Sequence, residues 1–175
     1  MVVLSMALLM LTAVWGIYNL TQKSYILSTN REELVQNGRI IMDRLTREIR
    51  QTDEFVTSLP ATNDHSVHEI KFQNAHNNIS IEYIRYYLGG NQVYRELSYY
   101  YFPSDPNTHV HWNALYSGNS PVNHPFETSL IGEYVSQLDF SGESGFIGID
   151  LTLSNNGRQI SLSNKILSRN TRLNP

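Results

Sequence analysis

The chain is 175 residues long, carries a formal net charge of −3 and contains no cysteine. Acidic and basic residues are nearly balanced, which argues against nucleic acid as a partner, and the lack of cysteine excludes disulfides, thiolate metal ligands and thiol nucleophiles. The length fits one ordinary domain together with an apolar N-terminal segment.

The first expected element is an apolar helix at the N-terminus. Residues 1–21 carry no charged side chain, and the first basic residue is Lys23, whereas a cleavable signal peptide begins with a basic region. Twenty helical residues rise about 30 Å, the thickness of the hydrocarbon core of a bilayer. A buried core helix is the alternative, but a helix that is apolar on all sides needs lipid or many protein neighbours. We therefore predict a transmembrane or filament-core helix over residues 1–21, with the lipid bilayer as a partner.

Small side chains recur within this apolar segment. Lipid tails and apolar side chains are equally hydrophobic, so helices that meet in a membrane select partners by close packing and polar contacts. The predicted helix-assembly contacts are Ser5, Ala7, Ala13 and Gly16.

An amphipathic helix is expected over residues 22–58, continuing the first segment into the globular domain. Apolar residues recur there at helical spacing, and Gly38 within their stripe indicates a close neighbour, because glycine weakens a helix interior by about 1 kcal/mol. Pro60 ends the pattern. The side chains predicted to pack on a β-sheet are Leu34, Ile41, Leu45 and Ile49, and those predicted to face solvent are Arg39, Asp43, Arg47 and Arg50.

Residues 59–175 are expected to form an antiparallel β domain, because the hydrophobic period changes to two. Gly89-Gly90-Asn91 and Asn156-Gly157 predict tight hairpin turns. Residues 103–126 hold four of the six prolines without clean alternation, which predicts a long surface loop. The predicted strands are 69–73, 79–88, 93–102, 134–140 and 147–153, with a returning strand after residue 157, a turn at 74–78 and a polar tail at 170–175. The expected fold class is α+β, with a long N-terminal helix packed on one antiparallel sheet.

No motif in the sequence indicates catalysis or a cofactor. His109 and His111 would lie on one side of an extended segment, with His124 as a third candidate ligand, but solvated loop histidines are the simpler interpretation. Glu133 and Asp139 are interpreted as solubilising residues at strand edges. Seven tyrosines between positions 83 and 101 could stack single-stranded nucleic acid, but only two arginines accompany them, which favours core packing. The sequence therefore predicts no catalytic, cofactor-binding or metal-ligating residue.

Several segments match, in order, those of one known family. They are Met1–Ser5 in its N-terminal apolar run, Gln36–Arg50 in the helix that follows, Val93–Glu96 in a middle strand, and Tyr134–Phe140, Ile149–Leu153 and Arg169-Asn170 in its C-terminal half. Together they resemble the minor pilins and pseudopilins of type IV pili, type II secretion systems and competence pili, in particular the PilW type and the secretion J type.

The resemblance implies a pilin-like fold and a non-enzymatic structural subunit that helps to prime assembly of a type IV pilus, a type II secretion pseudopilus or a competence pseudopilus. It implies other minor and major pilin-like subunits and the inner-membrane assembly platform as partners. It also implies a single-pass location in the inner (cytoplasmic) membrane with the globular domain outside the cytoplasm, or at the filament tip. The family's leader peptide and first mature residues are not found in this sequence, and Met1 falls about where the seventh mature residue should be, so we expect a trimmed or misplaced start, with a true lack of the processing site as the alternative. The alternatives are a membrane-anchored extracytoplasmic ligand-binding or sensor module, and an anchored enzyme.

Overall fold

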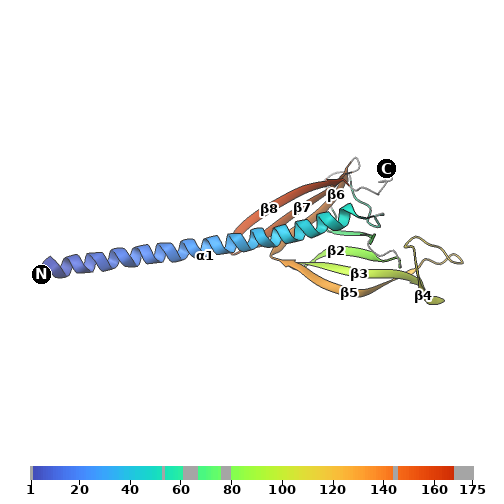
Figure 1. Ribbon diagram of the computed structural model, residues 1–175, viewed down its shortest axis with the longest axis horizontal. Coiled ribbons are helices and arrows are strands. Elements are labelled where there is room, and N and C mark those ends of the chain that lie inside the picture. Colours follow the sequence, from blue (N-terminus) through green and yellow to red (C-terminus); the bar gives the residue numbers. More distant parts are fainter. Residues whose placement is uncertain (1, 53, 61–66, 76–79, 144–145, 168–175) are drawn as a thin grey trace.

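The computed structural model describes residues 2–52, 54–60, 67–75, 80–143 and 146–167. Over these residues the fold is α+β, as predicted, with one long N-terminal helix followed by eight strands in two antiparallel sheets (Figure 1).

The helix α1 runs without interruption from Val2 to Arg50. Its first half projects away from the β domain, and its second half lies where the two sheets meet, in contact with strands of both (Figure 1). Among the described residues, no helix is both long enough and apolar enough to cross a membrane. The predicted membrane-spanning first half is therefore not supported by the structure.

The end of α1 differs from the prediction, which placed it near residue 58. The helix stops at Arg50 because the next residues pair with the first strand instead of continuing the helix. The Thr52 hydroxyl donates to the Gln73 carbonyl oxygen (2.9 Å), and the amide of Val56 donates to the Lys71 carbonyl oxygen (2.8 Å). These backbone partners replace the helical hydrogen bonds that residues 51–58 would otherwise have made.

The larger sheet has five strands, of which β1, β2, β3 and β4 follow one another in sequence and in space. The hairpin between β2 and β3 closes at the predicted tight turn, in which Gly89 pairs with Gln92 and Gly90 has a positive φ of 64°. β5 pairs with β3 along the edge that β2 does not occupy. The bounds are β1 Glu69–Gln73, β2 Tyr83–Gly89, β3 Gln92–Phe102, β4 Asp105–Val110 and β5 Val122–Glu133.

Two sequence predictions in this region need correction. The stretch 103–126 is not one long loop, because it contains all of β4 and the start of β5. The predicted strand 79–88 is observed as β2, which begins at Tyr83; residue 79 and part of the predicted 74–78 turn lie outside the described residues.

The second sheet has three strands in the order β6-β7-β8, so the β domain has two sheets rather than the single one predicted. Tyr134, with a φ of 64°, is the only residue between β5 and β6 and forms the corner at which the chain changes sheet. The predicted turn at Asn156-Gly157 is confirmed, with positive φ at both residues, as a type I′ hairpin requires. The bounds are β6 Val135–Glu143, β7 Phe146–Asn155 and β8 Arg158–Leu167; the predicted tail 170–175 lies outside the described residues.

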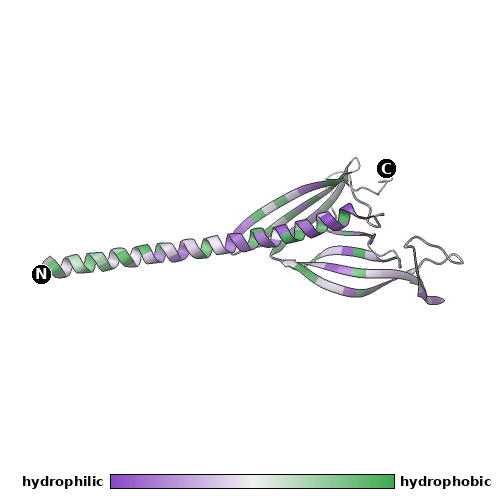
Figure 2. Cartoon of the chain, viewed as in Figure 1, coloured by the Kyte–Doolittle hydropathy of each residue, from purple (hydrophilic) through white to green (hydrophobic). Residues whose placement is uncertain are grey.

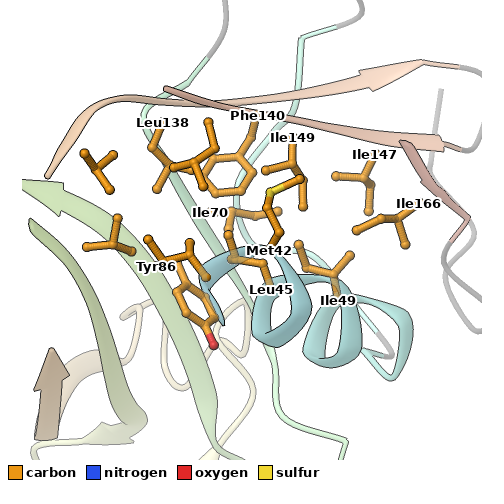
Figure 3. Close-up of a cluster of buried hydrophobic side chains, with 14 of the residues drawn as sticks. Met42, Leu45, Ile49, Ile70, Tyr86, Leu138, Phe140, Ile147, Ile149 and Ile166 are labelled. Carbon is orange, nitrogen blue, oxygen red and sulfur yellow. The ribbon is translucent and has the colours of Figure 1, made fainter. Parts of the chain in front are cut away.

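A single hydrophobic core joins α1 to both sheets (Figure 3). The four helix residues predicted to pack on a sheet, Leu34, Ile41, Leu45 and Ile49, are all fully buried in it. Gly38 lies against the second sheet, because a Cβ atom at this position would come within 2.6 Å of Leu162 Cδ1 and 3.1 Å of Leu153 Cδ1. Glycine at this point therefore lets the helix backbone approach β7 and β8 closely.

We expect the fragment that begins at Lys23 to be folded and monomeric in plain buffer, whereas the full chain should need detergent. Every buried residue of the core lies at Leu34 or later, while most of the exposed large apolar residues of α1 precede Lys23. Circular dichroism and analytical ultracentrifugation of both chains test this prediction. A full chain that stays monomeric in plain buffer would contradict it.

Candidate assembly surface on the N-terminal helix

Apolar residues prevail in the first half of α1 (Figure 2), and their side chains are exposed. Their exposed fractions range from 54% for Tyr18 to 82% for Val3. An apolar surface of this extent on one subunit marks a site of contact with other molecules. The exposed large residues before Lys23 are Val3, Met6, Leu8, Leu9, Met10, Leu11, Val14, Trp15, Ile17, Tyr18 and Leu20.

Polar side chains in this half of α1 bond back to their own helix. The hydroxyl of Thr12 donates to the Leu9 carbonyl oxygen (2.9 Å), and the hydroxyl of Thr21 donates to the Ile17 carbonyl oxygen (2.9 Å). The amide of Asn19 likewise donates to the Trp15 carbonyl oxygen (3.0 Å). Such bonds satisfy these groups without water, so the segment can enter an apolar environment at a low desolvation cost.

The four small residues predicted as helix-assembly contacts are all exposed, but they do not share one face. At about 100° per residue, Ser5, Ala13 and Gly16 fall within about a quarter of the helix circumference, whereas Ala7 lies on the opposite side. A Cβ atom at Gly16 would meet no neighbouring group of the described chain within 4 Å, in contrast to Gly38. Nothing in the described part of this subunit therefore requires glycine at position 16.

A polar cluster fixes the other end of α1 to the larger sheet. The Glu48 carboxylate accepts hydrogen bonds from the Tyr86 hydroxyl of β2 (2.8 Å) and from Arg95 Nε of β3 (3.0 Å), and Arg44 Nε lies 3.5 Å from its other oxygen. The side chains of Glu48 and Arg95 are only 10% and 12% exposed. Burial raises the pKa of the Tyr86 hydroxyl, and the Glu48 carboxylate raises it further. We call Glu48, Tyr86 and Arg95 the Glu48 cluster; no pattern in the sequence links its members.

The face of α1 that points away from the sheets is polar and charged in its second half. Arg39, Asp43, Arg47 and Arg50 are exposed there, in agreement with the solvated face that the sequence predicts. Two shallow hollows lie along this face, one lined by residues from Ser28 to Asp43 and the other by residues from Asp43 to Gln51. The exposed surface of α1 thus changes from apolar to charged along its length.

The histidines considered as metal ligands lie apart. His109 stacks on Tyr99 at 4.0 Å between ring centroids, and His124 lies 5.1 Å from the same tyrosine ring. His111 instead lies against Tyr83 and 3.5 Å from a Glu54 carboxylate oxygen. Tyr83 pairs with Ser98, the neighbour of Tyr99, so the two tyrosines point to opposite faces of the sheet. The expectation that His109 and His111 share one side is wrong, and no group of three or more His, Asp or Glu in the described ranges is placed to hold a metal ion.

Asp139 also differs from its predicted solubilising role. Asp139 is only 7% exposed, and its carboxylate forms hydrogen bonds with His68 Nδ1 (2.7 Å) and with the side-chain amide of Gln137. Glu133 accepts a hydrogen bond from Gln92 (2.9 Å) on β3. Of the seven tyrosines, Tyr83 and Tyr86 are fully buried and the other five are partly buried, but only Tyr86 belongs to the hydrophobic core that was predicted to hold them.

Comparison with models of known protein families and with curated protein sequences gives no match to this chain.

Proposed function

We propose that this chain is a non-enzymatic structural subunit of the pilin type, which assembles by packing the first half of α1 among the corresponding helices of other subunits. The observation that supports this most directly is the contrast within one continuous helix. One face of its second half is buried against two sheets, while its first half exposes large apolar side chains and its polar residues Thr12, Asn19 and Thr21 bond to its own backbone. A helix of this kind gains most from surroundings made of similar helices.

The sequence resemblance supports the filament system and the partner subunits named in this proposal. The partners would be minor and major pilin-like subunits, together with the inner-membrane assembly platform, and the product would be a type IV pilus, a type II secretion pseudopilus or a competence pseudopilus. The β domain would then decide which neighbours are accepted, because it holds α1 in one fixed position through the core and the Glu48 cluster.

Before assembly, this proposal places the apolar half of α1 in the inner membrane and the β domain outside the cytoplasm. Lipid would cover the exposed apolar side chains until helices of other subunits replaced it. Membrane fractionation of cells that express the full chain and the fragment from Lys23 tests this placement. Recovery of both proteins in the soluble fraction would contradict it.

Replacing Gly16 or Ala13 with leucine should reduce association with partner subunits several-fold. Both positions lie on one side of α1, where a bulky side chain would hold a neighbouring backbone away. Leucine is a better helix former than glycine, so a loss at position 16 cannot come from a weakened helix. The measurement is co-purification, from detergent extracts, with the pilin-like proteins encoded in the same gene cluster, together with filament output.

Ala7→Leu is the matched control, since it adds the same side chain on the opposite side of the helix. It should retain association if Ser5, Ala13 and Gly16 form the contact face. Full association and filament output in both test variants would show that this face is not the contact, and recognition would then have to lie in the β domain.

A further inference from the structure

A buried lysine reaches across the outer face of the larger sheet, the face that points away from α1. Lys71 lies on β1 between the core residues Ile70 and Phe72, so its side chain points to the outer face, yet the residue is only 8% exposed. Its Nζ donates to the side-chain oxygen Oδ1 of Asn123 on β5 (2.7 Å) and to the Tyr100 hydroxyl of β3 (2.9 Å). β1 and β5 are the outermost strands of the series β1-β2-β3-β5, so this one side chain connects both ends of that series.

Two tyrosine rings lie beside the amine. Nζ lies 4.5 Å from the ring centroid of Tyr100 and 5.9 Å from that of Tyr83, which is fully buried. Trp112 covers the Tyr83 hydroxyl through a hydrogen bond from its backbone amide (3.0 Å). Burial lowers the pKa of Lys71 to about 8, against an opposing effect of the Glu96 carboxylate. About one molecule in ten then carries a neutral amine at pH 7, far more than for an ordinary lysine.

We propose that Lys71 and Asn123 join to form an amide cross-link between β1 and β5. The neutral Nζ of Lys71 attacks the Cγ carbon of Asn123, and a bond forms between Nζ and Cγ. The bond between Cγ and Nδ2 breaks, and Nδ2 leaves as ammonia after it takes up the proton that Nζ gives up. The reaction needs no oxidant, reductant or co-reactant.

The geometry places the reacting groups within reach of one another. A carbonyl bond is about 1.2 Å long, so an Nζ atom 2.7 Å from Oδ1 lies within about 4 Å of Cγ. A small side-chain rotation would bring it to the separation of about 3–3.5 Å at which bound groups react. The Tyr100 hydroxyl already contacts Nζ and can pass its proton toward the leaving nitrogen. A buried amine with a lowered pKa is the form in which lysine acts as a nucleophile.

The mass of the intact full chain, extracted in detergent, tests the proposal directly. The expected mass is lower than the sequence mass by one ammonia molecule. Trypsin should then release the peptide 51–85 joined to the peptide 96–158, because the modified Lys71 is no longer a cleavage site and no Lys or Arg lies within 96–157. Tandem mass spectrometry of the joined peptides separates this product from ring closure at Asn37-Gly38 or Asn156-Gly157, which also releases ammonia. Peptides 51–71 and 96–158 recovered only as separate species, after incubation at pH 9, would overturn the proposal.

Lys71→Arg and Asn123→Ala should each abolish the joined peptides, while Lys165→Arg and Asn107→Ala, at exposed positions, should leave them unchanged. Because the decisive measurement is made on the wild-type chain, a variant that fails to fold does not affect the outcome. In the wild-type chain, formation of the cross-link should accelerate as the pH rises through about 8, where the amine loses its proton. A joined pair of other peptides would assign the cross-link elsewhere and overturn the role of Lys71.

Discussion

Replacing Glu48 with alanine is expected to lower the free energy of unfolding by about 3 kcal/mol, the lower end of the cost of breaking a buried ion pair. The loss leaves Arg95 without its carboxylate and the buried Tyr86 hydroxyl without its acceptor. The lower end applies because Glu48 and Arg95 retain slight exposure. Urea unfolding of the fragment that begins at Lys23, followed by circular dichroism, measures the change.

Two further variants test whether the loss of stability comes from the buried ion pair of Glu48 and not from removing any carboxylate on α1. Asp43→Ala removes an exposed carboxylate from the same helix and should change stability by less than about 0.5 kcal/mol. The double variant Glu48→Met with Arg95→Met removes both buried charges together and should cost less than Glu48→Ala, because Arg95 is no longer left buried without its carboxylate and the side chain of Arg44, 37% exposed, still reaches water. An equal loss in Asp43→Ala would show that the Glu48 cluster has no special role in holding α1.

Leu45→Ala and Ile49→Ala should each destabilise the domain by about 2–5 kcal/mol. Both side chains are fully buried and lie one helical turn apart between the two sheets (Figure 3), so truncation leaves a cavity that two packed layers cannot easily close. The same urea titration measures the loss. The matched control is Ile40→Ala, because Ile40 is 49% exposed on the same helix. Losses below about 0.5 kcal/mol at Leu45 and Ile49 would mean that this stripe is not packed in solution.

The parts of the fold that the sequence predicts well are those with local physical causes. Ile147, Ile149, Leu151 and Leu153 alternate with smaller or polar residues because one face of β7 lies in the core, while the opposite face, apart from Gly148, is at least partly exposed. The turn that follows needs positive φ at two residues, which asparagine and glycine tolerate. The stripe on α1 is equally clear, since one side of its second half faces the core.

The sequence did not predict β5, because hydrophobic and polar residues do not alternate along it. Most of its side chains are exposed on both faces, so there is no pressure toward alternation. Pro125, which argues against a strand, lies at a shift in register between β3 and β5, where the regular ladder of hydrogen bonds is interrupted. Proline is tolerated at such irregular positions because a missing amide hydrogen is not needed there.

The buried polar groups could not be predicted, because their partners are distant in sequence. Lys71 alternates with apolar residues as a solvent-facing strand residue would, and only the fold brings Tyr100 and Asn123 over it. Glu48 and Arg95 are separated by 47 positions, and each alone looks like an ordinary surface charge. Such pairings depend on how the strands are ordered, which the hydrophobic pattern does not specify.

The uninterrupted course of α1 also determines how the subunit would bear mechanical load. The helix spans 49 residues, roughly 70 Å, with no proline at which it could bend. Tension applied to its N-terminal half would therefore reach the buried half without loss and act along the helix axis. Because that half is anchored in two sheets at once, the force would shear many side-chain contacts together instead of peeling them one after another. A subunit built in this way resists extraction as a unit, and its weakest point under tension would be the contact with its neighbours.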